Sequence, residues 1–218
     1  MSDSPEKPAE ESRKGCGCLF ISLGCISFLG LLLVIIVYYF RLSAPILVEE
    51  TFEDGDTGWL VVGDAQGESD KPTYETEGGN PGAHMSAVDN AVGGVWFWSA
   101  PDSFLEQLDA SWKENGSLRA SLHFDLYQDN LSNPFEDKDV LLGSGDLELH
   151  YRHENPPGAE WTSYRVPLNP AKWTNPATEQ PATPEEMDQV LSELDRLWIR
   201  GEFNTGPDSG GIDNILIR

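Results

Sequence analysis

Hydrophobic and polar residues alternate with a period of two along much of residues 46–218. The longest example runs from Leu118 to Tyr127, where every second residue from Leu118 onward is apolar. This alternation is typical of a β-strand with one buried face. Ten segments with strand-like composition are flanked by Gly, Pro, Asn or Asp residues. They are Ile46–Phe52, Trp59–Gly63, Ala83–Ala87, Gly94–Trp98, Leu118–Tyr127, Val140–Leu142, Leu147–Arg152, Ser163–Val166, Leu197–Phe203 and Ile212–Ile217. Ten short strands predict an all-β fold, an antiparallel β-sandwich or jelly roll.

Two segments have a helical pattern instead. Residues 102–110, DSFLEQLDA, follow Pro101 and predict one or two helical turns. The second helix is predicted to begin with Thr183 as N-cap, Pro184 at the first helical position and Glu186 completing a capping box. Its apolar residues form one stripe, so this helix is expected to pack on the sandwich. They are Met187, Val190, Leu191 and Leu194.

An uncharged apolar run covers residues 18–40 and ends in aromatic residues typical of a membrane interface. About 20 apolar residues span a bilayer as a helix, whereas the apolar part of a secretory signal is shorter. We therefore predict a single transmembrane helix here, in preference to a cleaved signal or a lipid-modified Cys25. Three basic residues precede the run and Arg41 alone lies close after it, which predicts a cytoplasmic N-terminus.

The predicted transmembrane helix divides the rest of the chain into a tail, a tether and a domain. Residues 1–14 are rich in Pro, Glu and Ser and are expected to form a disordered cytoplasmic tail. Residues 41–46 are a tether, and residues 47–218 form one exported domain. All three cysteines, at positions 16, 18 and 25, precede this domain, which is expected to fold without disulfides.

Charge is concentrated in the exported part. Four of the 37 acidic and four of the 14 basic residues precede Ile46, so residues 46–218 carry the whole formal net charge of −23. Binding to phosphate backbones depends on cationic contacts, so nucleic acid is excluded as a partner. An acidic surface favours cations instead.

Catalytic motifs are not found in the sequence. His150 and His153 are three residues apart and fall on opposite faces of an extended strand. The motifs Gly-x-Ser-x-Gly, His-Glu-x-x-His and the Walker sequence are absent. The protein is therefore not expected to be an enzyme. The many acidic residues leave a glycan-acting enzyme, with two carboxylates across a groove, as a third alternative.

Aromatic residues offer candidate ligand contacts. Trp96 and Trp98 alternate with Phe97, so their two indoles share one face of the sheet. Large aromatic residues usually lie in the core, but exposed on a sheet they would form a flat platform for a sugar ring. Trp161 and Tyr164 present the same choice, and these four residues are the candidate binding residues.

The final segment, 201–218, combines glycines, acidic residues and a closing strand. Residues 204–211, NTGPDSGG, are predicted to form a hairpin whose glycines permit positive φ. In the strand that follows, Asp213 is expected on the same face as Ile215 and Ile217.

Five blocks occur in order across residues 50–217. They are FEDGDTGWLVVGDAQG, GGNPGAHMSAVDNAVGGVWFWSAPDSFL, DLELHYR, EWTSYRVPL and TPEEMDQVLSELDRLWIRGEFNTGPDSGGIDNILI. Their order and spacing resemble the laminin B domain, also called laminin domain IV. The resemblance implies a galactose-binding-like jelly roll, close to carbohydrate-binding modules. In laminins the domain lies between cysteine-rich modules that this sequence lacks, so a membrane-displayed copy is expected.

The resemblance also implies a structural Ca²⁺ where an acidic first strand meets the last strand. Calcium takes six to eight oxygen ligands, and the candidate ligands are Glu50, Glu53 and Asp213. The alternative is that these residues serve as ordinary turn and edge residues.

The sequence thus predicts a membrane-anchored, non-catalytic, extracytoplasmic recognition or adhesion module with a glycan as the first-choice ligand. The second hypothesis is a structural envelope or matrix module that binds another extracellular protein.

Overall fold

The structure is a computed structural model that describes residues 45–63, 71–89 and 94–218, together with Gly30. The chain divides into two units, Met1–Ala44 and Pro45–Arg218. Apart from Gly30, the predicted tail, the predicted span and most of the tether lie outside the described residues. Among the residues that are described, no helix is long and apolar enough to cross a membrane.

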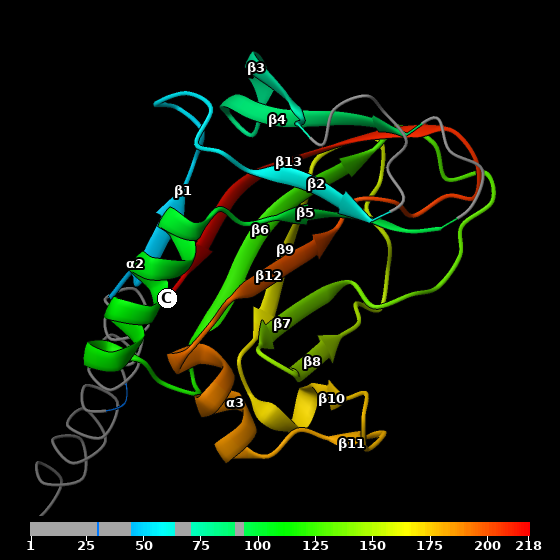
Figure 1. The fold of residues 1–218 in the computed structure, drawn as a ribbon. Helices are drawn as coiled ribbons and strands as arrows, with labels where there is room; N and C mark the ends of the chain where they lie inside the picture. Colours follow the sequence, from blue (N-terminus) through cyan, green and yellow to red (C-terminus); the bar gives the residue numbers. More distant parts are fainter. Residues whose placement is uncertain (1–29, 31–44, 64–70, 90–93) are drawn as a thin grey trace, which may run out of the picture. The chain divides into compact units, whose positions relative to one another are not determined.

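Two antiparallel sheets make up the second unit (Figure 1). The six-stranded sheet has the order β3-β4-β13-β6-β9, with β1 paired to the end of β13. Its strands are β1 Val48–Glu50, β3 Thr73–Gly79, β4 Gly82–Asp89, β6 Ser121–Gln128, β9 Thr162–Pro167 and β13 Asp208–Ile217. The last strand therefore lies in the interior of the sheet, beside three partners.

The seven-stranded sheet has the order β11-β10-β8-β7-β12-β5-β2. Its strands are β2 Leu60–Gly63, β5 Trp96–Ser99, β7 Val140–Ser144, β8 Leu147–Tyr151, β10 Thr174–Asn175, β11 Gln180–Pro181 and β12 Arg196–Arg200. Strands β7, β12 and β5, in the middle of this sheet, carry most of its fully buried residues.

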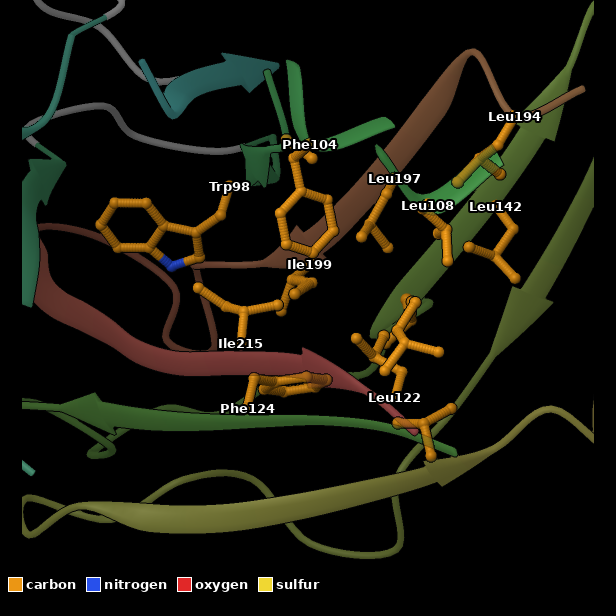
Figure 2. Packing of buried hydrophobic residues seen from close by; sticks show 14 of the residues in the cluster. Trp98, Phe104, Leu108, Leu122, Phe124, Leu142, Leu194, Leu197, Ile199 and Ile215 are labelled. Carbon is orange, nitrogen blue, oxygen red and sulfur yellow. The ribbon is translucent and has the colours of Figure 1, made fainter. Parts of the chain in front are cut away.

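The inner faces of the two sheets enclose one hydrophobic core. Figure 2 shows Trp98 of β5 pointing toward Ile215 of β13 and Phe124 of β6. All three side chains are at most 1% exposed. Burial of large apolar side chains contributes about 2 kcal/mol each before conformational entropy is subtracted, so this core is the main stabilising element.

Two helices complete the core. Helix α2, Asp102–Asn115, buries Phe104 and Leu108, and helix α3, Pro184–Ser192, packs on β7 and β8. The predicted capping box at Thr183 is confirmed. Its hydroxyl accepts a bond of 3.1 Å from the Glu186 N–H, and the Glu186 carboxylate accepts one of 2.8 Å from the Thr183 N–H. A 3₁₀ turn, η1 at Pro170–Lys172, precedes β10.

The all-β antiparallel fold with two short helices is confirmed, although several segments differ from expectation. Strand β3 was not predicted because its sequence, TYETEGG, is polar and mostly exposed. Helix α2 is longer than predicted because Trp112 continues its buried stripe. The predicted hairpin at residues 204–211 is wrong in its second half. Asp208–Gly211 instead extends β13, because β4 and β6 pair with it on both sides.

Candidate functional site

The β3–β4 hairpin folds over the outer face of the six-stranded sheet. Its tip residue Asn80 donates from its backbone N–H to Asp213 Oδ2 of β13 at 2.6 Å. The Asn80 side-chain amide donates to Asp125 Oδ2 of β6 at 3.0 Å. Strand β3 is at one edge of this sheet, β4 is next to it, and β13 and β6 follow toward the middle. The hairpin tip therefore covers the middle of the sheet and places polar groups there.

A cluster of acidic side chains lies beneath this tip. Asp213 is fully buried, it is paired in register with the buried Asp125, and the exposed Glu53 lies beside them. Burial, together with the negative charges of Asp125 and Glu53, raises the pKa of Asp213 to about 6, although N–H groups of Asn80 and Asn214 bond its carboxylate. Like charges gathered around a buried carboxylate are the arrangement that a bound cation would stabilise.

Two glycines permit the close approach of the hairpin to this cluster. A Cβ on Gly79 would lie 2.8 Å from Asp213 Oδ2. A Cβ on Gly82, whose φ is +89°, would overlap the Glu53 carboxylate. The Glu53 carboxylate is held there by the Ala83 N–H at 3.0 Å. Side chains larger than hydrogen would therefore displace both carboxylates.

Two of the three predicted calcium ligands influence one another: the negative charge of Glu53 lies close enough to raise the pKa of Asp213. The third, the Glu50 carboxylate, accepts a bond of 2.7 Å from the Phe52 N–H. Asp125 is the acidic residue that sequence reasoning missed. Carboxylate and amide oxygens of this cluster fit the hard oxygen ligands of Ca²⁺. Among the described residues, however, no three His, Cys, Asp or Glu side chains converge at metal-binding geometry.

The predicted face of Asp213 is wrong, because β13 contains an irregularity. Asn214 has a φ of +51°, and the pairing with β6 shifts between Asp213 and Leu216. The shift turns Ile215 and Ile217 into the core, while Asp213 points to the outer face. One extra residue in a strand reverses the side-chain alternation beyond it.

Aromatic side chains gather on the same outer face. Trp161 packs edge-to-face with Tyr127 at 4.7 Å and with His84 at 5.3 Å between ring centroids. Its indole N–H donates to the Gly78 carbonyl of β3 at 2.8 Å. Because Trp161 precedes β9, at the opposite edge of the sheet from β3, this bond joins the two edges across the face. The indole is half-buried, so part of it faces solvent.

Trp96 and Trp98 do not form a ligand platform, and the prediction that they bind a ligand is wrong. Both are 0% exposed and pack edge-to-face with each other at 5.0 Å. Strand β5 lies between β2 and β12, so its inward residues enter the core. Gly201 packs directly on the Trp96 ring, where a Cβ would overlap it.

Tyr164 lies on the opposite side of the sheet from Trp161. Its ring stacks on Phe124 at 5.5 Å, and its hydroxyl donates to the Asn155 carbonyl at 3.2 Å. Burial and the charge of Asp139 raise its pKa. The structure thus leaves Trp161 alone on the outer face among the four predicted aromatic residues.

A cavity of about 250 Å³ is lined in part by His153, whose ring packs against Tyr164. Its wall contains a buried ion pair between Arg200 and Asp139, 3.1 Å apart. The Arg200 guanidinium lies between the rings of Phe135 and Phe203. No local motif marks this cavity, because its residues come from three separate segments, 134–139, 152–156 and 200–203.

His153 is the buried titratable group of this cavity. Its Nε2 atom is buried without a hydrogen-bond partner among the described residues. Its ring packs against Phe124, Tyr151 and Tyr164. Burial lowers its pKa to about 4. The folded protein therefore holds this imidazole in its neutral form near pH 7.

Two facing antiparallel sheets with an acidic exterior and a polar outer face define an all-β sandwich module. The chain belongs to the Laminin B (Domain IV) family, which residues 97–217 match. These residues include β5 except its first residue, both helices and the whole of β6 to β13.

The chain is also similar to the basement membrane-specific heparan sulfate proteoglycan core protein of Mus musculus. The two are 24% identical over 174 residues, which is 78% of this chain and 5% of the mouse protein. This chain therefore spans a small part of that relative's length.

Among solved structures, the L4b domain of human laminin alpha-2 aligns with a TM-score of 0.56 at 12% identity. The alignment covers 79% of this chain and 98% of the laminin domain, and it shows a shared fold. A family 11 carbohydrate-binding module of Clostridium thermocellum, in complex with a mixed-linked tetrasaccharide, aligns with a TM-score of 0.48 at 18% identity. That alignment covers 78% of this chain and 95% of the module, and it is too loose to transfer a binding site.

Replacement of His153 by Phe should change how stability depends on pH. The unfolded imidazole takes up a proton below about pH 6.5, whereas the folded one resists protonation down to about pH 4. The wild type should therefore lose up to about 3 kcal/mol relative to His153→Phe as pH falls from 6.5 to 4. The measurement is the free energy of unfolding from urea titrations at each pH.

Comparison with the variant is needed because Asp139, Asp208 and Asp213 have raised pKa values and act in the opposite direction. Their stabilising effect is present at low pH and is lost as pH rises. Parallel pH profiles for the wild type and the variant would contradict a buried neutral His153.

Proposed function

We propose that residues 45–218 form a non-catalytic extracellular recognition or adhesion module that binds a glycan at the outer face of the six-stranded sheet. The ligand would lie beside Trp161, with Tyr127 and His84 as its neighbours.

The observation that carries the proposal is the fixed, half-buried indole of Trp161. Its hydrogen bond to Gly78 and its ring contacts to Tyr127 and His84 hold its orientation before any ligand arrives. An ordered aromatic ring loses little conformational entropy on binding. The apolar C–H face of a sugar ring can pack on it while the sugar hydroxyls bond Glu75, which is paired with His84 in the β3–β4 hairpin.

A protein partner is the second candidate. The mouse relative's name places that protein in the basement membrane, and the net charge of −23 would favour a partner with a basic surface. Val88, 65% exposed on the same outer face, offers an apolar contact for such a partner.

Replacement of Trp161 by Ala should weaken glycan binding at least tenfold, because the aromatic contact is lost. A glycan array first identifies the ligand for the 45–218 unit, and calorimetry then compares the variants. The matched control is Trp198→Ala, which removes a half-buried indole stacked on Phe97 on the other sheet. Equal loss of affinity in both variants, or no array signal with calcium present, would contradict the glycan proposal.

Calcium is proposed as a structural ion beside Asp213, with Asp125 and Glu53 as neighbouring carboxylates that would have to move closer together to hold it. Support comes from the complete burial of Asp213 and from the like charges that raise its pKa. When bound, the ion would supply positive charge that relieves this repulsion. The amides of Asn80 and Asn214 orient Asp125 from the other side. The cluster lies under the hairpin tip, so the ion would stabilise the scaffold without contacting the ligand.

Addition of calcium chloride should raise the melting temperature of the 45–218 unit by several degrees, because a ligand that binds only the folded state stabilises it. The variant Asp213→Asn should lose a large part of this increase, whereas Glu50→Gln should keep all of it. A melting temperature that is the same in calcium and in chelator would sink the structural-ion proposal.

The membrane anchor is proposed from the apolar run at residues 18–40. The full chain should stay with the membrane after alkaline carbonate extraction, and deletion of residues 15–44 should release it. Protease added outside sealed cells should degrade the C-terminal domain and spare an N-terminal epitope. Recovery of the full chain in the soluble fraction would refute the anchor.

A further inference from the structure

One end of the sandwich interior is lined by polar side chains. Three of these polar side chains come from the six-stranded sheet: Asp89 of β4, Gln128 of β6 and Asp208 of β13. Each lies two or four residues from a buried apolar residue of its own strand. Those apolar residues are Met85, Leu126 and Ile212, in that order. The even spacing places the three polar side chains on the face that points into the core. Asp208 and Asp89 are direct partners in the antiparallel pair, so their side chains are neighbours.

A fourth polar side chain reaches this place from the other sheet. Glu202 follows β12 by two residues and is 1% exposed. Gly210 of β13 marks the place where the two sheets meet here. A Cβ built on Gly210 would lie 3.5 Å from the carbonyl oxygen of Gly201, the residue before Glu202. The same Cβ would lie 3.2 Å from Gln128 Oε1. Gly210 is two residues beyond Asp208, on the same face. The segment at 201–202, Gln128 and Asp208 thus surround one point in the interior.

Two of these side chains have unused polar atoms. Both amide atoms of Gln128 and both carboxylate oxygens of Asp208 are buried without a hydrogen bond to any described residue. The two side chains are 1% and 5% exposed. A backbone N–H of Asn204 is near enough to lower the pKa of Asp208, but it does not reach hydrogen-bonding geometry. Burial of an unpaired polar group destabilises the folded state, and burial of an unpaired charge destabilises it more, so a stabilising partner is expected.

The neighbouring arginine does not supply that partner for Asp208. The Arg200 guanidinium bonds the Asp139 carboxylate and the backbone carbonyls of Phe135 and Glu202. Meanwhile Glu202, Asp89 and Asp129 add negative charge around Asp208. The donor set that faces this point is therefore oxygen-rich and negative.

We propose that this end of the core is a second cation site, formed by the carboxylates of Asp208 and Glu202 and the amide oxygen of Gln128. Asp89 adds negative charge beside it. An all-oxygen donor set selects a hard cation, and calcium accepts a mixture of carboxylate, amide and carbonyl oxygens with flexible geometry. Zinc sites usually contain His or Cys ligands, and this set contains neither. The site joins β13 to the segment after β12 and so ties the two sheets together at one end.

The test separates this site from the cation proposed at Asp213. In the 45–218 unit carrying Asp213→Asn, calcium chloride should still raise the melting temperature by about 5–10 °C at saturation. Addition of Asp208→Asn should abolish this remaining increase, and Glu202→Gln should reduce it. Calorimetry should count one calcium ion in the Asp213→Asn protein and none in the double variant. Glu160→Gln, which removes an exposed charge, should change neither measurement.

Two outcomes would overturn the proposal. The first is a calcium response in the Asp213→Asn protein that Asp208→Asn leaves intact, which would place the ion elsewhere. The second outcome combines two results. The melting temperature of the Asp213→Asn protein does not change with calcium or magnesium, and it rises as the pH is lowered below 7, whereas that of the double variant does not rise. That result would mean that a proton, and not a metal ion, occupies the site. If Asp208→Asn does not fold, Gln128→Leu provides the same test, because it removes an oxygen and keeps the core apolar.

Discussion

Negative charge buried against strand β13 is the constraint on which the structure depends. The strand pairs with β1, β4 and β6, so it cannot leave the centre of its sheet without disrupting the sandwich. It nevertheless carries Asp208 on the inner face and Asp213 on the outer face, and both are buried. A domain with a net charge of −23 gains no stability from burying two of its carboxylates unless cations or protons neutralise them. The hairpin over Asp213 and the segment after β12 both serve to enclose these carboxylates.

The same constraint links the scaffold to the proposed ligand face. The β3–β4 hairpin that covers Asp213 also supplies the Gly78 carbonyl that orients Trp161. Stabilisation of the hairpin would therefore hold the indole ready for a ligand. In the proposed function this arrangement would separate two tasks: the acidic cluster would fix the hairpin, and the aromatic face would contact the ligand. Membership of the Laminin B (Domain IV) family fits a module of this kind.

Much of the fold could be predicted from local patterns, because alternation and capping are local. The strand around Phe124 and the helix after Thr183 both follow from a few neighbouring residues. The sites could not be predicted in the same way. Alternation places Trp96 and Trp98 on one face but does not say that this face is the core. Asn214 alone adopts a left-handed backbone conformation in strand β13, and this reverses the face to which each side chain after Asp213 points. The partners Asp125 and Gln128 come from a strand at least 80 residues earlier in the chain, and no sequence spacing records that contact.

The most direct test of the account is a crystal structure of the 45–218 unit grown in calcium, with anomalous diffraction measured to locate the ions. The account predicts one calcium ion beneath the β3–β4 hairpin, bonded to Asp213, and one at the end of the core, bonded to Asp208. Anomalous density at neither position, with both carboxylates in hydrogen bonds as protonated acids, would contradict it.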